Sequence, residues 1–221
     1  MGFAYLFIGL FDWALALLAL LQVVVPGLAR GPEYTALLMA AGCLMFLLLI
    51  VAHELGHHFA GLAVGIRSCV IALTFVKLVR LRGRWRVSRN NDWLHPAGYV
   101  ASEITPHHST WRWGLAVFAG PAVNLVLSIV CLVSAAVVHT GPPEGMGDPS
   151  GAGWRQLVLL LPGTPAVAAL NLAGLISLWL GAGSLVPAGG KGGNRNDGDL
   201  LLALWCGKPH PVFDDDDDAQ W

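Results

Sequence analysis

The sequence predicts an all-α polytopic membrane protein with about four transmembrane helices and a small cytoplasmic β-hairpin or sheet between the second and third. Of its 221 residues, 55% are hydrophobic and only 12% are charged, whereas a soluble domain carries about 25% charged residues. Four stretches reach the roughly 20 apolar residues that a helix needs to cross about 30 Å of hydrocarbon. The formal net charge of −1, with no basic helix, gives no reason to expect a nucleic acid as partner.

The predicted spans divide the chain into short loops, one long basic loop and a tail. They cover residues 3–28, 36–64, 114–138 and 162–186. We expect residues 1–205 to form a single membrane-embedded domain that contains a cytoplasmic basic β-loop at about 67–112. Residues 206–221, which include five consecutive aspartates, are expected to form a solvated acidic tail.

Positive charge predicts the orientation in the membrane. Eight of the 13 Lys and Arg residues lie in the loop 67–112, whereas the loop 140–153 has none. Because cytoplasmic loops carry the excess of Lys and Arg, we expect the basic loop and both termini in the cytoplasm. The protein is then an integral, multi-pass protein of a bacterial-type inner (plasma) membrane. His53 follows Ala36 by roughly 26 Å of helix, which places it toward the cytoplasmic side.

The basic loop is predicted to contain strands. Residues 70–76 are rich in β-branched and aromatic side chains, and residues 77–87 alternate between apolar and basic ones. An Arg-Gly-Arg turn at 82–84 separates two candidate strands, and residues 97–100 are a candidate third. The arginine stripe indicates either a solvated strand face lying on anionic headgroups or a substrate-binding surface.

The most informative motif lies inside the second predicted span. Residues 53–57 read His-Glu-Leu-Gly-His within an apolar run. On a helix, His53 and His57 share one face at i and i+4, as a zinc ion requires, and Glu54 stands beside them to act on a water molecule. Ionisable groups at the centre of a membrane helix cost roughly 2.5–3.5 kcal/mol each on insertion scales, so such residues mark functional sites.

A catalytic zinc site needs a third protein ligand and an open position. Asp197 follows the fourth predicted span, which returns the chain to the cytoplasmic side where His53 lies. Its carboxylate could be that ligand, but the Asp-Gly pair could equally be a turn or a helix cap. Asp199 is the nearest competitor. From spacing alone, these alternatives stay open.

Two further elements accompany the zinc motif. Residues 120–124 read Gly-Pro-Ala-Val-Asn at the helix that follows the zinc helix. Residues 184–187 read Ser-Leu-Val-Pro, and a glycine-rich spacer leads from there to Asp-Gly at 197–198. With the motif at 53–57, this set resembles the site-2 protease family of intramembrane zinc metalloproteases, over roughly residues 36–205. In that family the second metal motif opens with Asn-x-x-Pro, so a serine stands here for the usual asparagine.

The resemblance implies one Zn²⁺ per chain, held by His53, His57 and Asp197, with Glu54 as the catalytic base. It also makes Asn124 a candidate for binding substrate or orienting a ligand, although asparagines in membrane helices often serve only to bond a neighbouring helix. His58 points away from the ligand face and is expected to face headgroups or to be hydrogen-bonded.

The implied activity is hydrolysis of peptide bonds in or near transmembrane segments of membrane proteins. The expected partners are single-pass or other transmembrane substrates and the lipid bilayer; no oligomeric state is predicted. The alternative is a catalytically silent relative that binds zinc or membrane partners, which the altered second motif keeps open.

Overall fold

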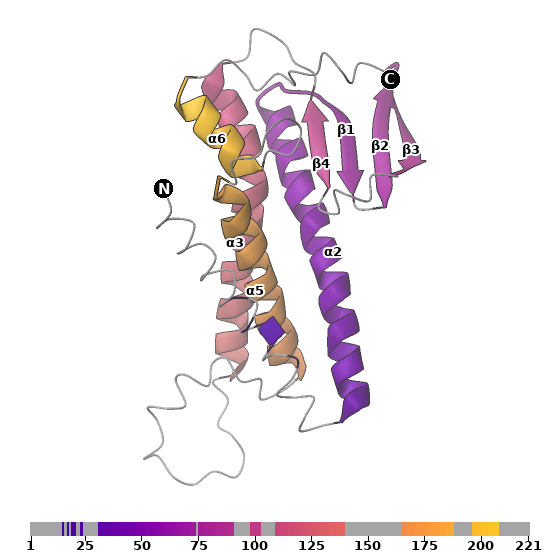
Figure 1. The fold of residues 1–221 in the computed structure, drawn as a ribbon, viewed down its shortest axis with the longest axis vertical. Coiled ribbons are helices and arrows are strands. Elements are labelled where there is room, and N and C mark those ends of the chain that lie inside the picture. Colours follow the sequence, from indigo (N-terminus) through magenta and orange to yellow (C-terminus); the bar gives the residue numbers. More distant parts are fainter. Residues whose placement is uncertain are drawn as a thin grey trace. The chain divides into compact units, whose positions relative to one another are not determined.

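The computed structural model describes residues 31–73, 75–90, 98–102, 109–139, 165–187 and 196–207, and five isolated residues between 15 and 23. The helices are α2 (Pro32–Ala63), α3 (Thr110–His139), α5 (Pro165–Leu185) and α6 (Asp197–Trp205). The strands are β1 (Ser68–Leu73), β2 (Val76–Leu81), β3 (Arg84–Arg89) and β4 (Tyr99–Ser102) (Figure 1).

Within the described part, three helices are long and apolar enough to cross a membrane. They are Pro32–Ala63, Thr110–Val138 and Ala166–Leu185, each within a few residues of a predicted span. The predicted span 3–28 lies outside the described residues apart from the isolated positions. The chain is therefore an integral membrane protein by the length and composition of these helices.

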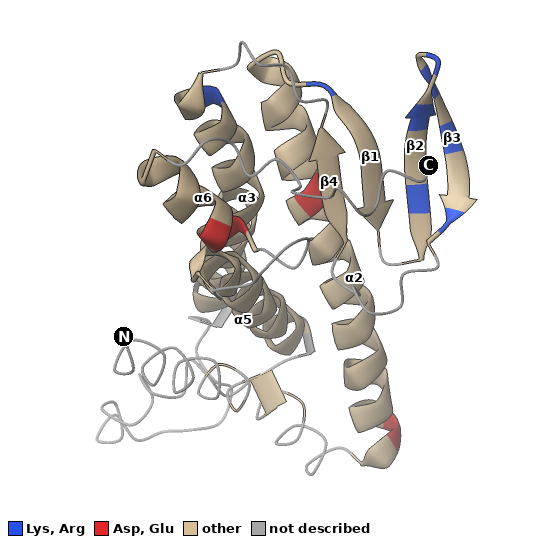
Figure 2. Cartoon of the chain, turned by 45° about the horizontal axis from the view of Figure 1, so that its top comes forward, with Lys and Arg blue, Asp and Glu red and all other residues tan. Residues whose placement is uncertain are grey.

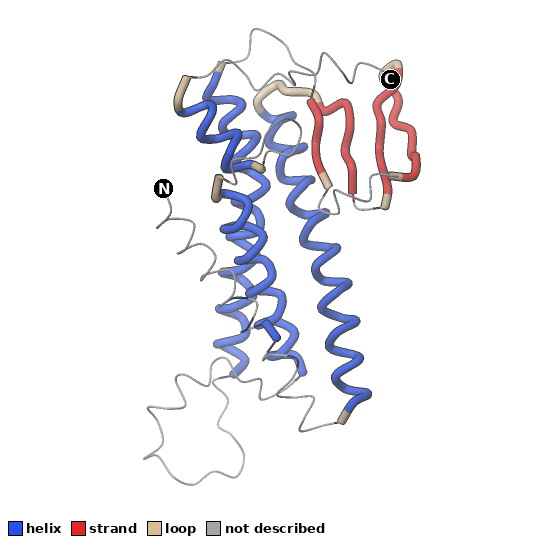
Figure 3. The backbone as a smooth tube through the Cα atoms, in the orientation of Figure 1, coloured by secondary structure: helices blue, strands red, loops and turns tan. Residues whose placement is uncertain are grey.

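The predicted all-α fold class is wrong. The structure combines the helices with a four-stranded antiparallel sheet (Figure 3), and this sheet follows the first of three candidate spans rather than the second of four. The physical reason is that the alternating segments pair with one another along their whole length. The central strand β1 buries apolar side chains, among them Ile71 and Ala72, so the segment builds a layer of its own rather than a hairpin appended to helices.

The chain falls into two compact units. Unit 1 consists of Met1–Phe46 and Leu125–Trp179. Within it the helices approach closely at small residues: a Cβ on Gly42 would lie 3.1 Å from Leu172, and a Cβ on Gly174 would overlap Leu132. The rings of Phe46 and Trp179 stack with centroids 6.3 Å apart.

Unit 2 consists of Leu47–Asn124 and Leu180–Trp221 and contains the sheet. Its strand order is β3-β2-β1-β4, with every neighbouring pair antiparallel. The predicted turn at 82–84 is confirmed: Arg82 and Gly83 both have positive φ, 49° and 80°, as the tight turn of a two-residue hairpin requires. β3 and β4 are the edge strands, whereas β1 and β2 are central.

A fixed turn leads from α2 into the sheet. Gly65 adopts φ 87°, and the Ile66 amide donates back to the Gly61 carbonyl at 2.8 Å. This is the Schellman geometry, in which an α-helix ends at a residue in the left-handed conformation. The Ile66 side chain is completely buried. Farther back on α2, His58 bonds Ser68 of β1 through its Nδ1 at 2.9 Å. The sheet is thus held against the C-terminal half of α2.

Candidate metal centre

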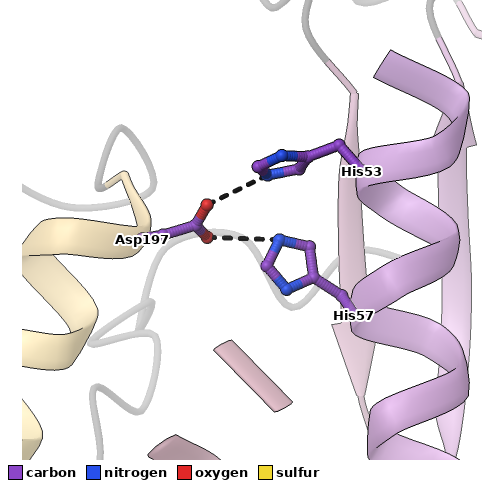
Figure 4. A group of neighbouring side chains, drawn as sticks. All are labelled: His53, His57 and Asp197. Carbon is purple, nitrogen blue, oxygen red and sulfur yellow. Dashed lines mark hydrogen bonds and ion pairs between the residues drawn. The ribbon is translucent and has the colours of Figure 1, made fainter. Parts of the chain in front are cut away.

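Two histidines on α2 form the base of the site. His53 and His57 lie one helical turn apart, so their rings project from the same face, with centroids 4.8 Å apart and the rings edge to face. Both point toward Asp197 at the start of α6 (Figure 4). The spacing in the sequence therefore brings the two imidazoles together, because side chains at i and i+4 lie on the same face of an α-helix.

Asp197 bridges the two rings with its two carboxylate oxygens. His53 Nε2 lies 3.0 Å from Oδ2, and His57 Nε2 lies 3.4 Å from Oδ1. One ligand atom from each residue lies within 4.8 Å of the others, so the three could hold a metal ion. All three side chains are 12–16% exposed, which leaves the group nearly enclosed but open to a water molecule.

The start of α6 distinguishes Asp197 from its competitor. Asn196 is the N-cap, and its Oδ1 accepts from the Asp199 amide at 2.9 Å. In return, the Asp199 carboxylate accepts from the Asn196 amide at 3.3 Å. Asp199 is thus committed to a reciprocal capping box, and Asp197, two residues earlier, is the carboxylate that reaches the histidines.

The same helix start is tied to the end of α5. The Asn196 side-chain amide donates to the Val186 carbonyl, so two residues separated by the glycine-rich spacer lie side by side. A Cβ on Gly198 would overlap the Leu185 carbonyl. The glycine of the Asp-Gly pair is therefore required for this close approach. The position of Asp197 is set by the packing of the start of α6 against the end of α5.

His57 is held in one orientation by the helix opposite. Its Nδ1 lies 2.8 Å from the Ala116 carbonyl of α3. Because a carbonyl only accepts, Nδ1 must carry the proton, and in the neutral ring the lone pair is then on Nε2, the nitrogen that faces Asp197. A backbone carbonyl in this place is the usual outer partner of a metal-binding histidine.

His53 has a corresponding partner on α3, the helix that also carries Ala116. The amide of Asn124 lies 3.1 Å from His53 Nδ1, and Asn124 is 0% exposed. A half-turn of the amide exchanges its nitrogen and oxygen, so the Asn124 oxygen can accept a hydrogen bond from Nδ1–H when Nε2 is used as a ligand. The buried asparagine therefore contacts the histidine rather than open solvent.

Small residues allow α2 and α3 to lie this close. A Cβ on Gly56 would lie 2.9 Å from the Ala119 carbonyl oxygen, and a Cβ on Gly120 would overlap the His57 imidazole. Gly120 of α3 thus lies opposite His57 of α2, and Asn124 of α3 lies opposite His53. On each helix the two residues are one turn apart. Close helix contacts of this kind are typical of membrane proteins.

Glu54 lies on α2 beside the sheet and is 6% exposed. Its carboxyl faces the start of β4: a Cβ on Gly98 would lie 3.2 Å from Glu54 Cγ and 3.3 Å from Oε1. Gly98 has φ 93°, a conformation that suits glycine. The absence of a side chain there leaves room for the glutamate between α2 and the sheet edge.

The ionisation of Asp197 suits a metal ligand. Burial by itself would raise the pKa of this carboxyl, but the hydrogen bonds that His53 and His57 donate when their Nε2 atoms carry protons outweigh burial and lower the pKa to about 2. The group is therefore a carboxylate at neutral pH, which is the form that binds a cation.

The structure brings together His53, His57, Asp197 and Asn124, all named from the sequence. His58 is hydrogen-bonded to Ser68 away from the ligand face, as expected. Sequence reasoning missed Asn196, Gly120 and Gly98. Only the Asn-Asp-Gly-Asp string at 196–199 carried a usable signal, because a side chain at the N-cap and an acid three residues later is a capping pattern.

Comparison with known proteins gives one match. The family model described as Peptidase family M50 matches residues 41–194. Searches of curated proteins and of solved structures found no match. The matched segment contains His53, His57 and Asn124 but ends before Asp197. The assignment of Asp197 to the cluster therefore depends on its position in the structure.

We predict that Gly120→Ala weakens metal binding. The new methyl group would overlap the His57 ring and displace Nε2, so the affinity for zinc, measured by competition with a chelator, should fall by at least about tenfold. Gly114→Ala is the matched control, because a Cβ on Gly114, in the same helix, meets nothing within 4 Å. Equal zinc affinity in both variants would contradict the close approach of α2 and α3.

Proposed function

Because the chain belongs to peptidase family M50, we propose that it is a zinc-dependent intramembrane endopeptidase that cleaves peptide bonds in or near transmembrane segments of membrane proteins. The observation that carries the proposal is the cluster of two imidazoles and a carboxylate within 4.8 Å, built on a membrane-length apolar helix. A scaffold that only binds zinc or membrane partners would not need the adjacent glutamate.

The donor set fits one Zn²⁺ per chain. Two histidine nitrogens and one carboxylate are a ligand set of catalytic zinc sites, which keep a further position open. His57 and His53 would bind through Nε2, since their Nδ1 atoms already contact Ala116 and Asn124. Asp197 would supply the third ligand atom. When bound, zinc supplies Lewis acidity that polarises the peptide carbonyl and activates water for attack.

Glu54 is the residue we propose as general base and acid. It would take the proton of the attacking water and then pass it to the amine that leaves when the C–N bond breaks. Its position supports this role: it precedes His57 by three residues on α2, and only 6% of it is exposed. The apolar surroundings keep bulk water from competing for this proton.

An exposed edge of the sheet could hold the substrate by pairing with it as an additional strand. A transmembrane helix hides its carbonyls in i to i−4 hydrogen bonds, so the cleaved segment must unwind and find other partners. The sequence suggests that an edge strand within residues 70–87 pairs with the unwound segment. That range contains most of the edge strand β3, together with the central strands β1 and β2. We assign this role to the other edge strand, β4, since it follows directly after Gly98, which lies beside Glu54, and strand addition uses exposed edges.

We further propose that the site opens toward the cytoplasmic side of a bacterial-type plasma membrane. The basic residues of the sheet follow the C-terminal end of α2 directly, and the positive-inside rule assigns such a segment to the cytoplasm. His53 lies within ten residues of that helix end, at a depth that water from the cytoplasm can reach.

Zinc content and cleavage together test the proposal. Detergent-purified wild type should hold one zinc per chain, and Asp197→Ala should lose it, whereas Asp199→Ala should keep it because Asp199 serves the helix cap. Glu54→Gln should retain zinc but cleave a reporter with one transmembrane helix about 10²–10⁴-fold more slowly. Zinc is measured by atomic emission and cleavage by gel mobility.

Two results would count against parts of this proposal. Zinc that survives Asp197→Ala would show that the third ligand is misassigned. Zinc bound by the wild type, together with cleavage that is absent or indifferent to Glu54→Gln, would favour the catalytically silent relative.

We predict that Asn124→Leu lowers zinc affinity by about 10–100-fold, because His53 loses the partner of its Nδ1. Asn171→Leu is the matched control: Asn171 is also a buried asparagine, on α5, but belongs to unit 1. A raised KM with unchanged zinc affinity would instead support a direct role of Asn124 in binding substrate.

Substrate should cross-link to β4 and not to β3. A benzoylphenylalanine placed at Ala101 should capture the reporter in a Glu54→Gln background, where the substrate is bound but not cut. The same probe at Val87, on the opposite edge of the sheet, is the control. Capture from Val87 and not from Ala101 would contradict the assigned edge.

A further inference from the structure

The β2–β3 hairpin concentrates positive charge that the proposed proteolysis does not use. It carries six of the chain's 13 Lys and Arg residues, and no Asp or Glu lies between Arg67 and Asn90. Figure 2 shows the basic positions gathered along β2, β3 and the turn between them. They are Lys77, Arg80, Arg82, Arg84, Arg86 and Arg89.

The strand period makes the hairpin amphipathic. Along β3, Trp85 and Val87 point to one face and Arg84 and Arg86 to the other, because successive strand residues alternate. Leu78 of β2 lies opposite Val87 and extends the apolar face. All of β3 is exposed: Val87 is 74% exposed and Trp85 42%. These apolar side chains are not buried in the sheet's own core.

The tip of the hairpin is an arginine-lined hollow. Leu81, Arg82, Arg84 and Arg86 line it, and the tight turn at Arg82 and Gly83 holds the two strands together there. The guanidinium group offers a planar fork of N–H donors that matches a phosphate group in two-point contact. Several such forks around one hollow suit a phosphate-bearing ligand.

The depth of the hairpin points to the source of that phosphate. Trp85 packs against His58 of α2, with ring centroids 6.0 Å apart. The rise along α2 from Ala36, where the apolar run begins, to His58 is roughly 33 Å. Hydrocarbon is about 30 Å thick, with headgroups beyond. Trp85 therefore lies where hydrocarbon gives way to headgroups, the layer in which tryptophan is enriched.

We propose that the β2–β3 hairpin is a lipid-binding element that seats in the headgroup layer. Arg82, Arg84 and Arg86 bind the phosphate groups of anionic phospholipids, and Trp85 and Val87 rest at the acyl boundary. The partner is the bilayer around the protein. This binding does not depend on zinc or on peptide hydrolysis, so it stands or falls separately from the proposed function.

Protection from trypsin tests the binding in the full chain. The purified protein is reconstituted into nanodiscs of phosphatidylcholine, alone or mixed with phosphatidylglycerol, and cleavage after Arg82, Arg84 and Arg86 is timed by mass spectrometry. Cleavage should be about tenfold slower in the anionic discs. The protection should vanish at about 1 M salt, where the Debye length is about 3 Å. A small soluble substrate calibrates trypsin in each kind of disc.

A pair of double variants isolates the charge. Arg84→Gln/Arg86→Gln should retain about tenfold less phosphatidylglycerol through purification than the wild type, as counted by native mass spectrometry. Arg84→Lys/Arg86→Lys keeps the charge and should retain most of it. Thermal unfolding in detergent, expected to be the same for both, checks that the fold is intact.

Three outcomes would overturn the proposal. The first is equal trypsin cleavage in neutral and anionic discs. The second is equal lipid retention by the Gln and Lys variants. The third is protection that appears only when inorganic phosphate or an acidic transmembrane reporter is added to neutral discs, since the hairpin would then recognise a soluble anion or a substrate rather than lipid.

Discussion

A polar side chain on a membrane-length apolar helix must find its partner within the protein, because hydrocarbon offers none. In α2 this constraint is met for each of the three histidines. His53 contacts Asp197 and Asn124, His57 contacts Asp197 and the Ala116 carbonyl, and His58 bonds Ser68. The helices and strands around the second half of α2 are placed so that they supply these partners, and the geometry of the site follows from that.

Meeting the constraint requires unusually close backbones. The His57 ring occupies the volume that a side chain at position 120 would take, and Gly198 lies against the end of α5 in the same manner. At both places glycine is needed because it has no Cβ atom, rather than for its flexibility. The carboxylate reaches the histidines because α6 begins at a capped Asn196 that is itself bonded to Val186. A substitution at any of these positions would therefore displace a side chain of the candidate metal centre without replacing that side chain.

The sequence predicts this site unevenly. His53, Glu54 and His57 follow from helical spacing alone, and the three described spans follow from hydropathy. The strands also follow from their alternation, but their assembly into a four-stranded sheet does not, because pairing between distant segments leaves no local pattern. The spacing alone leaves the choice between Asp197 and Asp199 open, because both are acids in the first turn of a helix. The sequence at 196–199 is compatible with a capping box, and the structure shows that this box forms and binds Asp199 to the backbone.

The order of elements along the chain matches what the proposed hydrolysis in a membrane would require. Unwinding a substrate helix exposes backbone groups that cost several kcal/mol each if unpaired in hydrocarbon, so the replacement partners must stand at the same depth as the reacting groups. The sheet begins five residues after α2 ends, across a turn fixed by Gly65 and the buried Ile66. Because β4 pairs with β1, this short, rigid connection to β1 also keeps the start of β4 beside Glu54. A longer or looser connection would leave the edge free to drift toward water, where an unwound segment has no need of it. A sheet seated by its basic hairpin in the headgroup layer would keep that edge at the depth where proton transfer and strand pairing can occur together.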